Sequence, residues 1–104
     1  MKIAAEIINC MPKNAEFSTQ TDGNGNTELR VWWNHPEHAE LEIIIPIPNE
    51  IRSHLKNSSE TQLQAQLSKI NLYIKVKLLN FNNEPPHKNP KKEIWNIPFN
   101  ELIN

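Results

Sequence analysis

The sequence predicts an α+β domain, with a mainly antiparallel sheet of four or five short strands and one or two helices packed on one face. Three segments, residues 27–33, 39–47 and 71–81, alternate apolar and polar residues with period two, as half-buried strands do. A fourth segment has an apolar stripe at helical spacing behind a pair of capping residues. Turn-forming proline, glycine and asparagine residues separate these segments. Together these three observations indicate short strands and helices around one core.

The chain has 104 residues, of which 38% are hydrophobic and 22% are charged. This length and composition predict one globular domain over residues 1–104. The single cysteine, Cys10, cannot form an internal disulfide and is typical of a reducing compartment. The first residues lack the features of a signal peptide, and no segment is long and apolar enough to span a bilayer. We therefore expect a cytoplasmic protein that does not associate with membranes.

Three strands are expected in the N-terminal half. Residues 2–9 alternate loosely and predict the first strand, whereas the polar residues 11–26 predict a loop or a wide hairpin connection. Residues 27–33 (TELRVWW) and 39–47 (AELEIIIPI) alternate more strictly and predict two further strands. Because Pro46 lacks the amide that a central ladder needs, that end of the strand is expected at an edge or a bulge.

The short segment 34–38 contains two histidines, a proline and a glutamate. Its length and its proline predict a hairpin turn with solvated histidines. His35 and His38 are weak candidates for metal ligands, because a catalytic zinc site needs three protein ligands and no H-E-x-x-H or paired-cysteine motif is present. The third ligand would have to be Glu37, His54 or His87. We therefore expect no bound metal and no cofactor.

Helices are expected in the middle of the chain. Residues 50–56 and 60–70 predict two helices, the second because Ser59 and Gln62 have the spacing of a capping box. The apolar stripe of the second helix consists of Leu63, Leu67 and Ile70.

The remaining segments are expected to complete the sheet. Residues 71–81 (NLYIKVKLLNF) alternate clearly and predict a strand antiparallel to residues 39–47. The lysines at positions 75 and 77 would then lie opposite the glutamates at positions 40 and 42. Residues 82–93 predict a proline-rich basic loop, and residues 94–104 predict a closing strand or a cover over the core.

The two neighbouring tryptophans of the strand at residues 27–33 must face opposite ways. Trp33 is expected in the core, and Trp32 is expected on the charged face. An exposed indole surrounded by charge resembles the anchor of a protein interface, and the alternative is that the C-terminal segment around Trp95 and Phe99 covers it. The candidates for partner binding are Trp32, Glu28, Arg30, Glu40 and Glu42.

Charge is distributed unevenly along the chain. Residues 1–50 contain eight acids and three basic residues, a net charge of −5, and residues 51–104 contain four acids and eight basic residues, a net charge of +4. With two glycines in the chain, a glycine-rich phosphate loop is not expected, and no credible catalytic set is present. We therefore expect a stand-alone protein-binding module without enzymatic activity. The expected type is an inhibitor, immunity protein or regulator, such as phages and other mobile elements carry, that blocks a partner with a basic surface.

Two alternatives and one further association remain. The first alternative is a nucleic-acid-binding module, since aromatic and basic residues on a sheet can stack bases and contact phosphates. Its candidate contacts are Tyr73, Lys75, Lys77, Lys88, Lys91 and Lys92. The second is a small metal-dependent enzyme at His35 and His38. An exposed strand edge also makes a homodimer possible.

Overall fold

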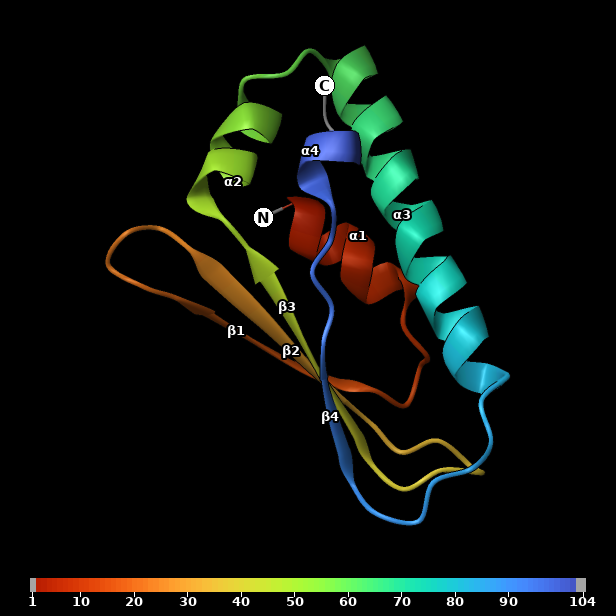
Figure 1. Ribbon diagram of the computed structural model, residues 1–104. Helices are drawn as coiled ribbons and strands as arrows, with labels where there is room; N and C mark the ends of the chain where they lie inside the picture. The colour runs from red at the N-terminus through yellow and green to blue at the C-terminus, as the bar shows by residue number, and fades with distance from the viewer. Residues whose placement is uncertain (1, 103–104) are drawn as a thin grey trace.

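The computed structural model describes residues 2–102 and arranges them in two layers, a sheet and a set of helices on one of its faces (Figure 1). In chain order the elements are α1 (Lys2–Cys10), β1 (Glu16–Thr21), β2 (Thr27–Trp33), β3 (Leu41–Ile47), α2 (Asn49–Lys56), α3 (Glu60–Asn82), β4 (Lys91–Ile94) and α4 (Phe99–Leu102). None of the helices within this range is long and apolar enough to cross a membrane.

The four strands follow one another in the order β1-β2-β3-β4. The first two pairs are antiparallel, and β4 is parallel to β3. The chain reaches β4 through α2 and α3, and a helical connection of this kind can return a strand in the parallel direction. The α+β class is thus confirmed. The expectation of a mainly antiparallel sheet is right only in part, because the sheet is mixed. Residues 2–102 contain four helices instead of one or two.

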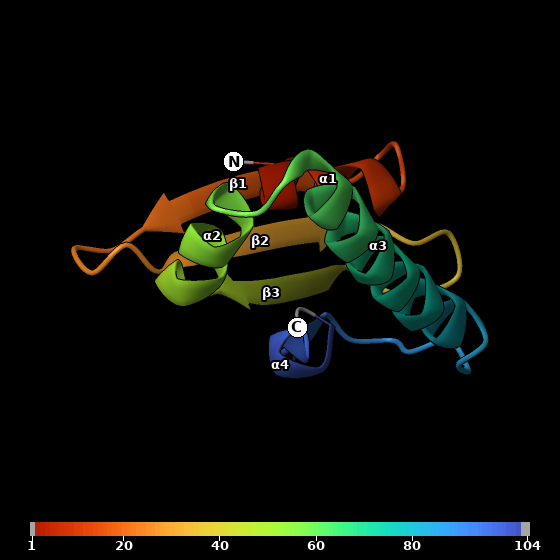
Figure 2. The same cartoon turned by 90° about the horizontal axis from the view of Figure 1, so that it is seen from above.

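The helices cover one face of the sheet only, as the view from above shows (Figure 2). The strictly alternating residues of β2 and β3 turn their apolar side chains toward these helices, as the sequence predicts. The buried core consists mainly of Leu29, Val31, Trp33, Leu41, Ile43, Ile45 and Ile47 from the sheet, Ile3 and Ile7 from α1, Leu63, Leu67, Ile70, Ile74, Leu78 and Phe81 from α3, and Trp95, Ile97 and Phe99 after β4. Pro46 lies beyond the segment of β3 that pairs with β4, so its missing amide leaves no ladder bond unmade on that side.

Two predictions for the first 26 residues are wrong. Residues 2–10 form helix α1 instead of a strand, because Ile3, Ala4 and Ile7 recur at helical spacing and are buried together. The expected loop at residues 11–26 contains β1, a strand at the sheet edge in which only Phe17 is partly buried. Residues 22–26 then form the tight turn into β2.

The prediction of a strand at residues 71–81 is also wrong, since these residues continue α3 to Asn82. The capping box is present as expected, with the Ser59 hydroxyl accepting from the Gln62 amide and the Gln62 side chain accepting from the Ser59 amide, both at 3.2 Å. No glycine or proline interrupts residues 60–82, so the helix can continue while Ile70, Ile74 and Leu78 bury one side of it.

The expected pairing of acidic and basic strands occurs with a different strand. Lys92 of β4 lies opposite Glu42 of β3, whereas Lys75 and Lys77 lie on α3 and face no strand of the sheet in register. The basic loop after α3 is shorter than predicted because β4 begins at Lys91. The last segment does act as a cover, and it does so by burying apolar side chains after β4 on the helix side.

Candidate functional site

The sheet face that points away from the helices is the candidate site. Strand register fixes which side chains share this face, because residues opposite each other in neighbouring strands point the same way. The outward rows are Glu16–Trp32–Glu42–Lys92, Ser18–Arg30–Ile44–Ile94 and Gln20–Glu28–Pro46. We call this set of residues the open face.

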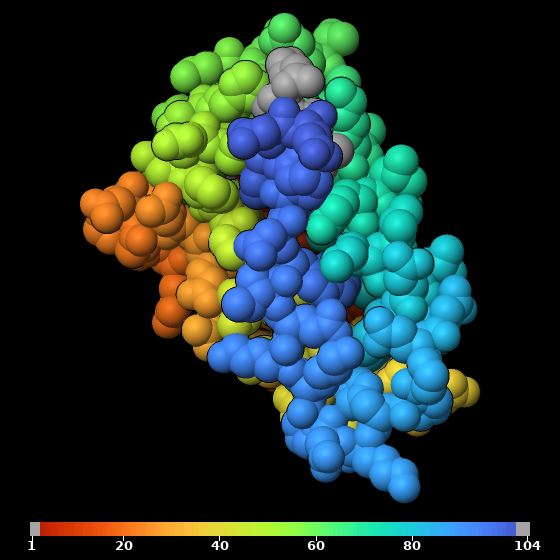
Figure 3. Space-filling view, in the orientation of Figure 1, coloured from red at the N-terminus to blue at the C-terminus, as the bar shows by residue number. Residues whose placement is uncertain are grey.

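The apolar part of the open face runs from β2 to β4. Trp32 is half-buried, Ile44 is 7% exposed and Ile94 is 59% exposed. The C-terminal aromatic residues Trp95 and Phe99 do not cover Trp32, because they are buried in the core on the other side of the sheet. The space-filling view shows the segment after β4 running between α2 and α3 on that helix side (Figure 3). The expected alternative, in which Trp95 and Phe99 cover Trp32, is therefore wrong.

Charged side chains frame this apolar strip. The guanidinium of Arg30 lies 3.2 Å from the Glu28 carboxylate and 3.5 Å from the Glu42 carboxylate, so one cation bridges two acids. Glu40 is exposed directly before β3 and on the open-face side by alternation, and its carbonyl accepts the Lys91 amide at 2.9 Å. The structure thus brings together all five residues that the sequence predicts for partner binding.

Sequence reasoning missed the five members of the open face that lie on the edge strands, which are Glu16, Ser18, Gln20, Lys92 and Ile94. Glu16 was missed because β1 is a polar edge strand whose alternation is hidden by exposure on both sides. The Asp-Gly-Asn-Gly turn that follows it could have signalled a hairpin. Lys92 and Ile94 belong to a four-residue strand with no apolar pattern, and nothing in the sequence indicates its pairing.

The end of the open face near the β1–β2 turn is hollowed. A cavity of about 550 Å³ lies there, with Gln20, Glu28 and Pro46 among its lining residues. The turn itself is held by the Asp22 carboxylate, which accepts the amides of Asn24 and Asn26 at 2.9 and 3.0 Å. The open face therefore combines an apolar strip, a charged frame and a hollow.

A second group of polar residues is the histidine cluster of His35, His38 and His87, located between the β2–β3 loop and the segment before β4. The Nδ1 atoms of His38 and His87 are 2.8 Å apart, so one ring donates to the other. His35 accepts the Glu37 amide at Nδ1 and shares a 2.9 Å hydrogen bond with Asn82 at Nε2. The three rings stack around Phe81 at centroid distances of 4.6 to 5.9 Å.

The prediction of solvated histidines is wrong for His38, which is buried, and its surroundings favour the neutral form of this ring. Burial lowers the pKa of His38, and the neighbouring rings of His35 and His87 lower it further, against the opposite effect of Glu37 and Glu84. Of the two further histidines considered as third ligands, the structure brings His87 next to His38, whereas His54 lies on α2 and bonds Gln66. Within residues 2–102 no three metal-ligating side chains converge. The cluster is held together by aromatic packing around Phe81 and by the hydrogen bonds of its rings.

The basic residues predicted to contact nucleic acid do not share one surface. Tyr73 donates to the Asn96 carbonyl at 3.3 Å, and Lys77 lies 5.6 Å from the Trp95 ring centroid, on the side of α3 that faces the C-terminal segment. Lys91 is paired with Glu84 and Glu93, whereas Lys92 points to the open face. The remaining candidates are Lys75, on the opposite side of α3, and Lys88, in the loop before β4.

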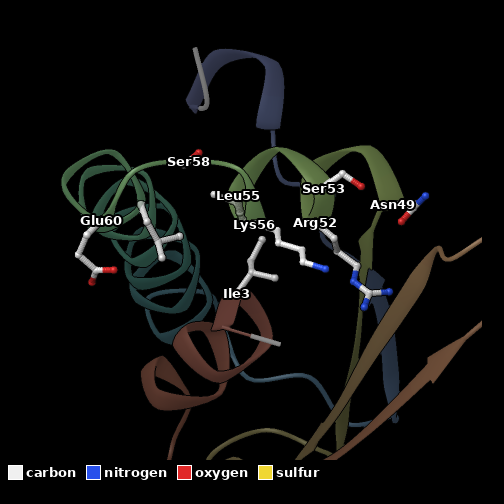
Figure 4. Close-up of a pocket in the computed structure, with 9 residues that line it drawn as sticks. Ile3, Asn49, Arg52, Ser53, Leu55, Lys56, Ser58 and Glu60 are labelled. Atoms are coloured by element: carbon white, nitrogen blue, oxygen red, sulfur yellow. The ribbon is translucent and has the colours of Figure 1, made fainter.

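A further cavity of about 610 Å³ lies between α2, the start of α3 and α1 (Figure 4). Its wall combines apolar side chains such as Ile3 and Leu55 with the basic Arg52 and Lys56. The Arg52 guanidinium donates to the Gly25 carbonyl at 3.1 Å and to the Thr27 hydroxyl at 3.4 Å. Arg52 therefore serves to hold α2 against the β1–β2 turn.

Comparisons of the chain with protein-family models, with curated proteins and with solved structures gave no match. The function proposed for the protein rests on the geometry of its surface.

Proposed function

We propose that the protein is a protein-binding module that uses its open face to cover a basic surface of a partner. One observation carries this proposal. The open face combines the half-buried Trp32 and the exposed Ile94 with carboxylates, and the helices of residues 2–102 all pack on the other face. A sheet of this kind buries apolar surface on both sides only when another surface meets it.

The composition of the open face matches that of a protein interface. Its centre is apolar and includes an indole, the side chain most enriched among residues that dominate binding energy. Its frame is charged, and its strands contribute three carboxylates, from Glu16, Glu28 and Glu42, against Arg30 and Lys92. With Glu40 the balance is four acids to two basic groups, which favours a basic partner through electrostatic steering.

The rigidity of the site supports occlusion of a partner as its mode of action. Arg30 is fixed between two carboxylates, and β2, the strand that carries it, is paired with a strand on each side. Groups that are already ordered lose little conformational entropy on binding. We therefore propose that the protein acts as an inhibitor, immunity protein or regulator that blocks a surface, and that it does so without catalysing a reaction.

The proposal is tested by placing a photo-crosslinking residue at Ser18, an exposed position on the open face. The matched control carries the same residue at Gln64, an exposed position on α3. Tagged protein is irradiated in lysate of the native host, with and without nuclease, and the adducts are identified by mass spectrometry. The expected result is one protein crosslinked at Ser18 but not at Gln64, unaffected by nuclease and lost in a Trp32→Ala background.

Three outcomes would contradict the proposal. Equal crosslinking from both positions would show that the open face is not the site. Retention of the adduct in Trp32→Ala would show that the indole is not the anchor. Nuclease-sensitive recovery would favour the nucleic-acid alternative, whose affinity should also fall steeply with added salt.

A further inference from the structure

Helix α3 has a second apolar side that the core does not use. Leu72, Val76 and Leu79 are 64%, 47% and 58% exposed, and their i, i+4, i+7 spacing places them on one face of the helix. The opposite side of the same helix buries residues such as Ile70, Ile74 and Leu78 in the core. A surface helix of a monomeric protein typically has one apolar stripe, so the second stripe calls for a partner surface.

The flanks of this stripe are basic. Lys69 and Lys75 are exposed and lie three residues before and after Leu72, so each is its neighbour on the helix surface. The only acid of α3 is Glu60, in its first turn, more than two turns from Leu72. We call the set Lys69, Leu72, Lys75, Val76 and Leu79 the α3 stripe.

The α3 stripe and the open face complement each other. The large hydrophobic side chains that are exposed within residues 3–101 are the three of the α3 stripe and Ile94 of the open face. One surface is apolar with basic flanks, and the other is apolar with a carboxylate frame. Figure 1 shows that α3 covers the opposite side of the sheet from the open face, so a single copy cannot bring the two surfaces together.

We propose that the α3 stripe of one copy packs on the open face of a second copy. This inference rests on the proposed function in that it uses the same docking face, and it names one class of surface that the face accepts. The dimensions agree, since Leu72 to Leu79 spans about 10 Å along the helix axis, and β2 to β4 spans two strand spacings, also about 10 Å. The docked helix covers the open face as α3 already covers the inner face of its own sheet.

The alternative contact between two α3 stripes is less favourable. Packing the stripes together brings Lys69 and Lys75 of both copies close to each other, which costs free energy through like-charge repulsion. Packing on the open face instead places these lysines near Glu16, Glu28 and Glu42. The preferred contact joins two different surfaces, so it does not stop at a symmetric dimer but continues to a ring or a chain of copies.

The contact is small, and its affinity should be correspondingly modest. One helix of about three turns on a four-stranded sheet corresponds to the low end of interface sizes, where association is transient. We expect a dissociation constant of the order of 10 to 100 μM, so that the protein is mostly monomeric when dilute. Added salt should weaken the association because the flanking charges are exposed.

Two variants, each lacking one surface, test the inference. The sheet variant carries Trp32→Ala and Ile94→Ser, and the helix variant carries Leu72→Gln and Leu79→Gln, which keep a helix-compatible residue at exposed positions. Sedimentation velocity is measured for each protein from about 5 to about 500 μM, a range that brackets the expected dissociation constant. Circular dichroism confirms that each variant is folded, and a variant with Ile94→Ser alone replaces the sheet variant if the double change unfolds it.

The expected result is complementation. The wild type should sediment faster with rising concentration, and each variant alone should remain monomeric, with association weakened at least tenfold. An equimolar mixture should form a one-to-one dimer and nothing larger, because only one pair of intact surfaces remains. A mixture that stays monomeric, or a wild type that stops at a dimer, would overturn the inference.

These outcomes are separable from those of the proposed function. A wild type that remains monomeric at about 500 μM, while Ser18 still crosslinks another protein, overturns the self-association and leaves the docking face intact. Self-association by complementation, with no other protein crosslinked at Ser18, supports the contact between copies and overturns the proposal that the open face blocks a different protein.

Discussion

The adjacent tryptophans Trp32 and Trp33 allow the assignment of the two sheet faces to be tested by stability. Trp33 is 6% exposed and packs against Phe81 at a ring-centroid distance of 5.7 Å and against His35 at 4.8 Å. Trp32 is half-buried on the open face, with Glu16 and Glu42 opposite it on the neighbouring strands. Replacing each with alanine removes the same atoms from two very different environments.

The expected costs follow from these environments. An indole presents roughly 150–250 Å², which at about 25 cal/mol per Å² corresponds to about 4–6 kcal/mol when fully buried. Trp33→Ala also leaves a cavity, so we expect a loss of about 3–5 kcal/mol in the free energy of unfolding. Trp32→Ala leaves no enclosed cavity and removes only contacts between neighbouring strands, so we expect about 1–2 kcal/mol.

Urea denaturation measures this difference. With a slope of about 1–1.5 kcal/mol per M for a domain of this size, the midpoint should fall by about 3 M in Trp33→Ala and by about 1 M in Trp32→Ala. Trp33→Phe gives a graded result if the alanine variant does not fold. As a second readout, Trp32→Phe should remove the fluorescence component that acrylamide quenches most readily. Equal midpoints, or a larger loss for Trp32→Ala, would show that the two faces are assigned wrongly.

Four further predictions concern other parts of the fold. Gly25→Ala should lower the free energy of unfolding by at least about 1 kcal/mol, as urea denaturation measures it. Gly25 has a φ of 82°, and an added Cβ would lie 2.8 Å from the Asn49 side chain. The matched control Gly23→Ala has open space around it and should be neutral or slightly stabilising. Ser59→Ala should lower the urea midpoint by an amount equivalent to about 1 kcal/mol, since it removes the capping box of α3, and an unchanged midpoint would mean that the cap does not stabilise the helix. Burial lowers the pKa of His38 below its ordinary value of 6.5, so the unfolded state binds this proton more tightly than the folded state. The stability contributed by neutral His38 should therefore be full above about pH 6.5 and decline as the pH falls through the lower folded-state pKa. His38→Phe should flatten this pH dependence of the free energy of unfolding, and an unchanged pH profile would contradict the prediction. Burial and the charge of Glu6 raise the pKa of the Cys10 thiol, against the opposite effect of Lys75. Iodoacetamide should therefore alkylate Cys10 at neutral pH more slowly in the folded protein than in urea, as followed by mass spectrometry. Equal rates would show that the thiol is not protected.

Sequence reasoning succeeded where a single period dominated. β2 and β3 alternate because one face of each strand lies in the core, and the pattern predicts the bounds of β2 and the end of β3, whereas β3 begins at Leu41 instead of residue 39. The capping box at Ser59 and Gln62 identified the start of α3 because it is a local chemical signal that does not depend on tertiary contacts. The same alternation correctly separated Trp32 from Trp33, and this separation placed the predicted partner-binding residues on one face.

The edges of the sheet could not be predicted in this way. β1 is exposed on both sides except at Phe17, so its residues have no apolar alternation. β4 has four residues, three of them charged, and it exists because the chain returns alongside β3 after α3. Such strands are specified by pairing with a neighbour already in place, and this information lies in the tertiary structure. The open face was consequently predicted with its two central strands but without the residues of its edge strands, Glu16, Ser18, Gln20, Lys92 and Ile94.

The wrong prediction for residues 71–81 has a physical cause that bears on function. In this segment Leu72, Ile74, Val76 and Leu78 alternate, which is the pattern of a strand with one buried face. In the helix, the same residues separate into two groups, with Ile74 and Leu78 in the core and Leu72 and Val76 exposed on the other side. A helix that is apolar on two opposite sides therefore imitates a strand over a short window. The same dual pattern that led to the error is what gives α3 its second apolar stripe, because a helix with one apolar side would have had polar residues at positions 72, 76 and 79. The sequence thus specifies a helix with one apolar side in its own core and a second on the surface, and the second side is the one that the proposed packing on the open face of another copy uses.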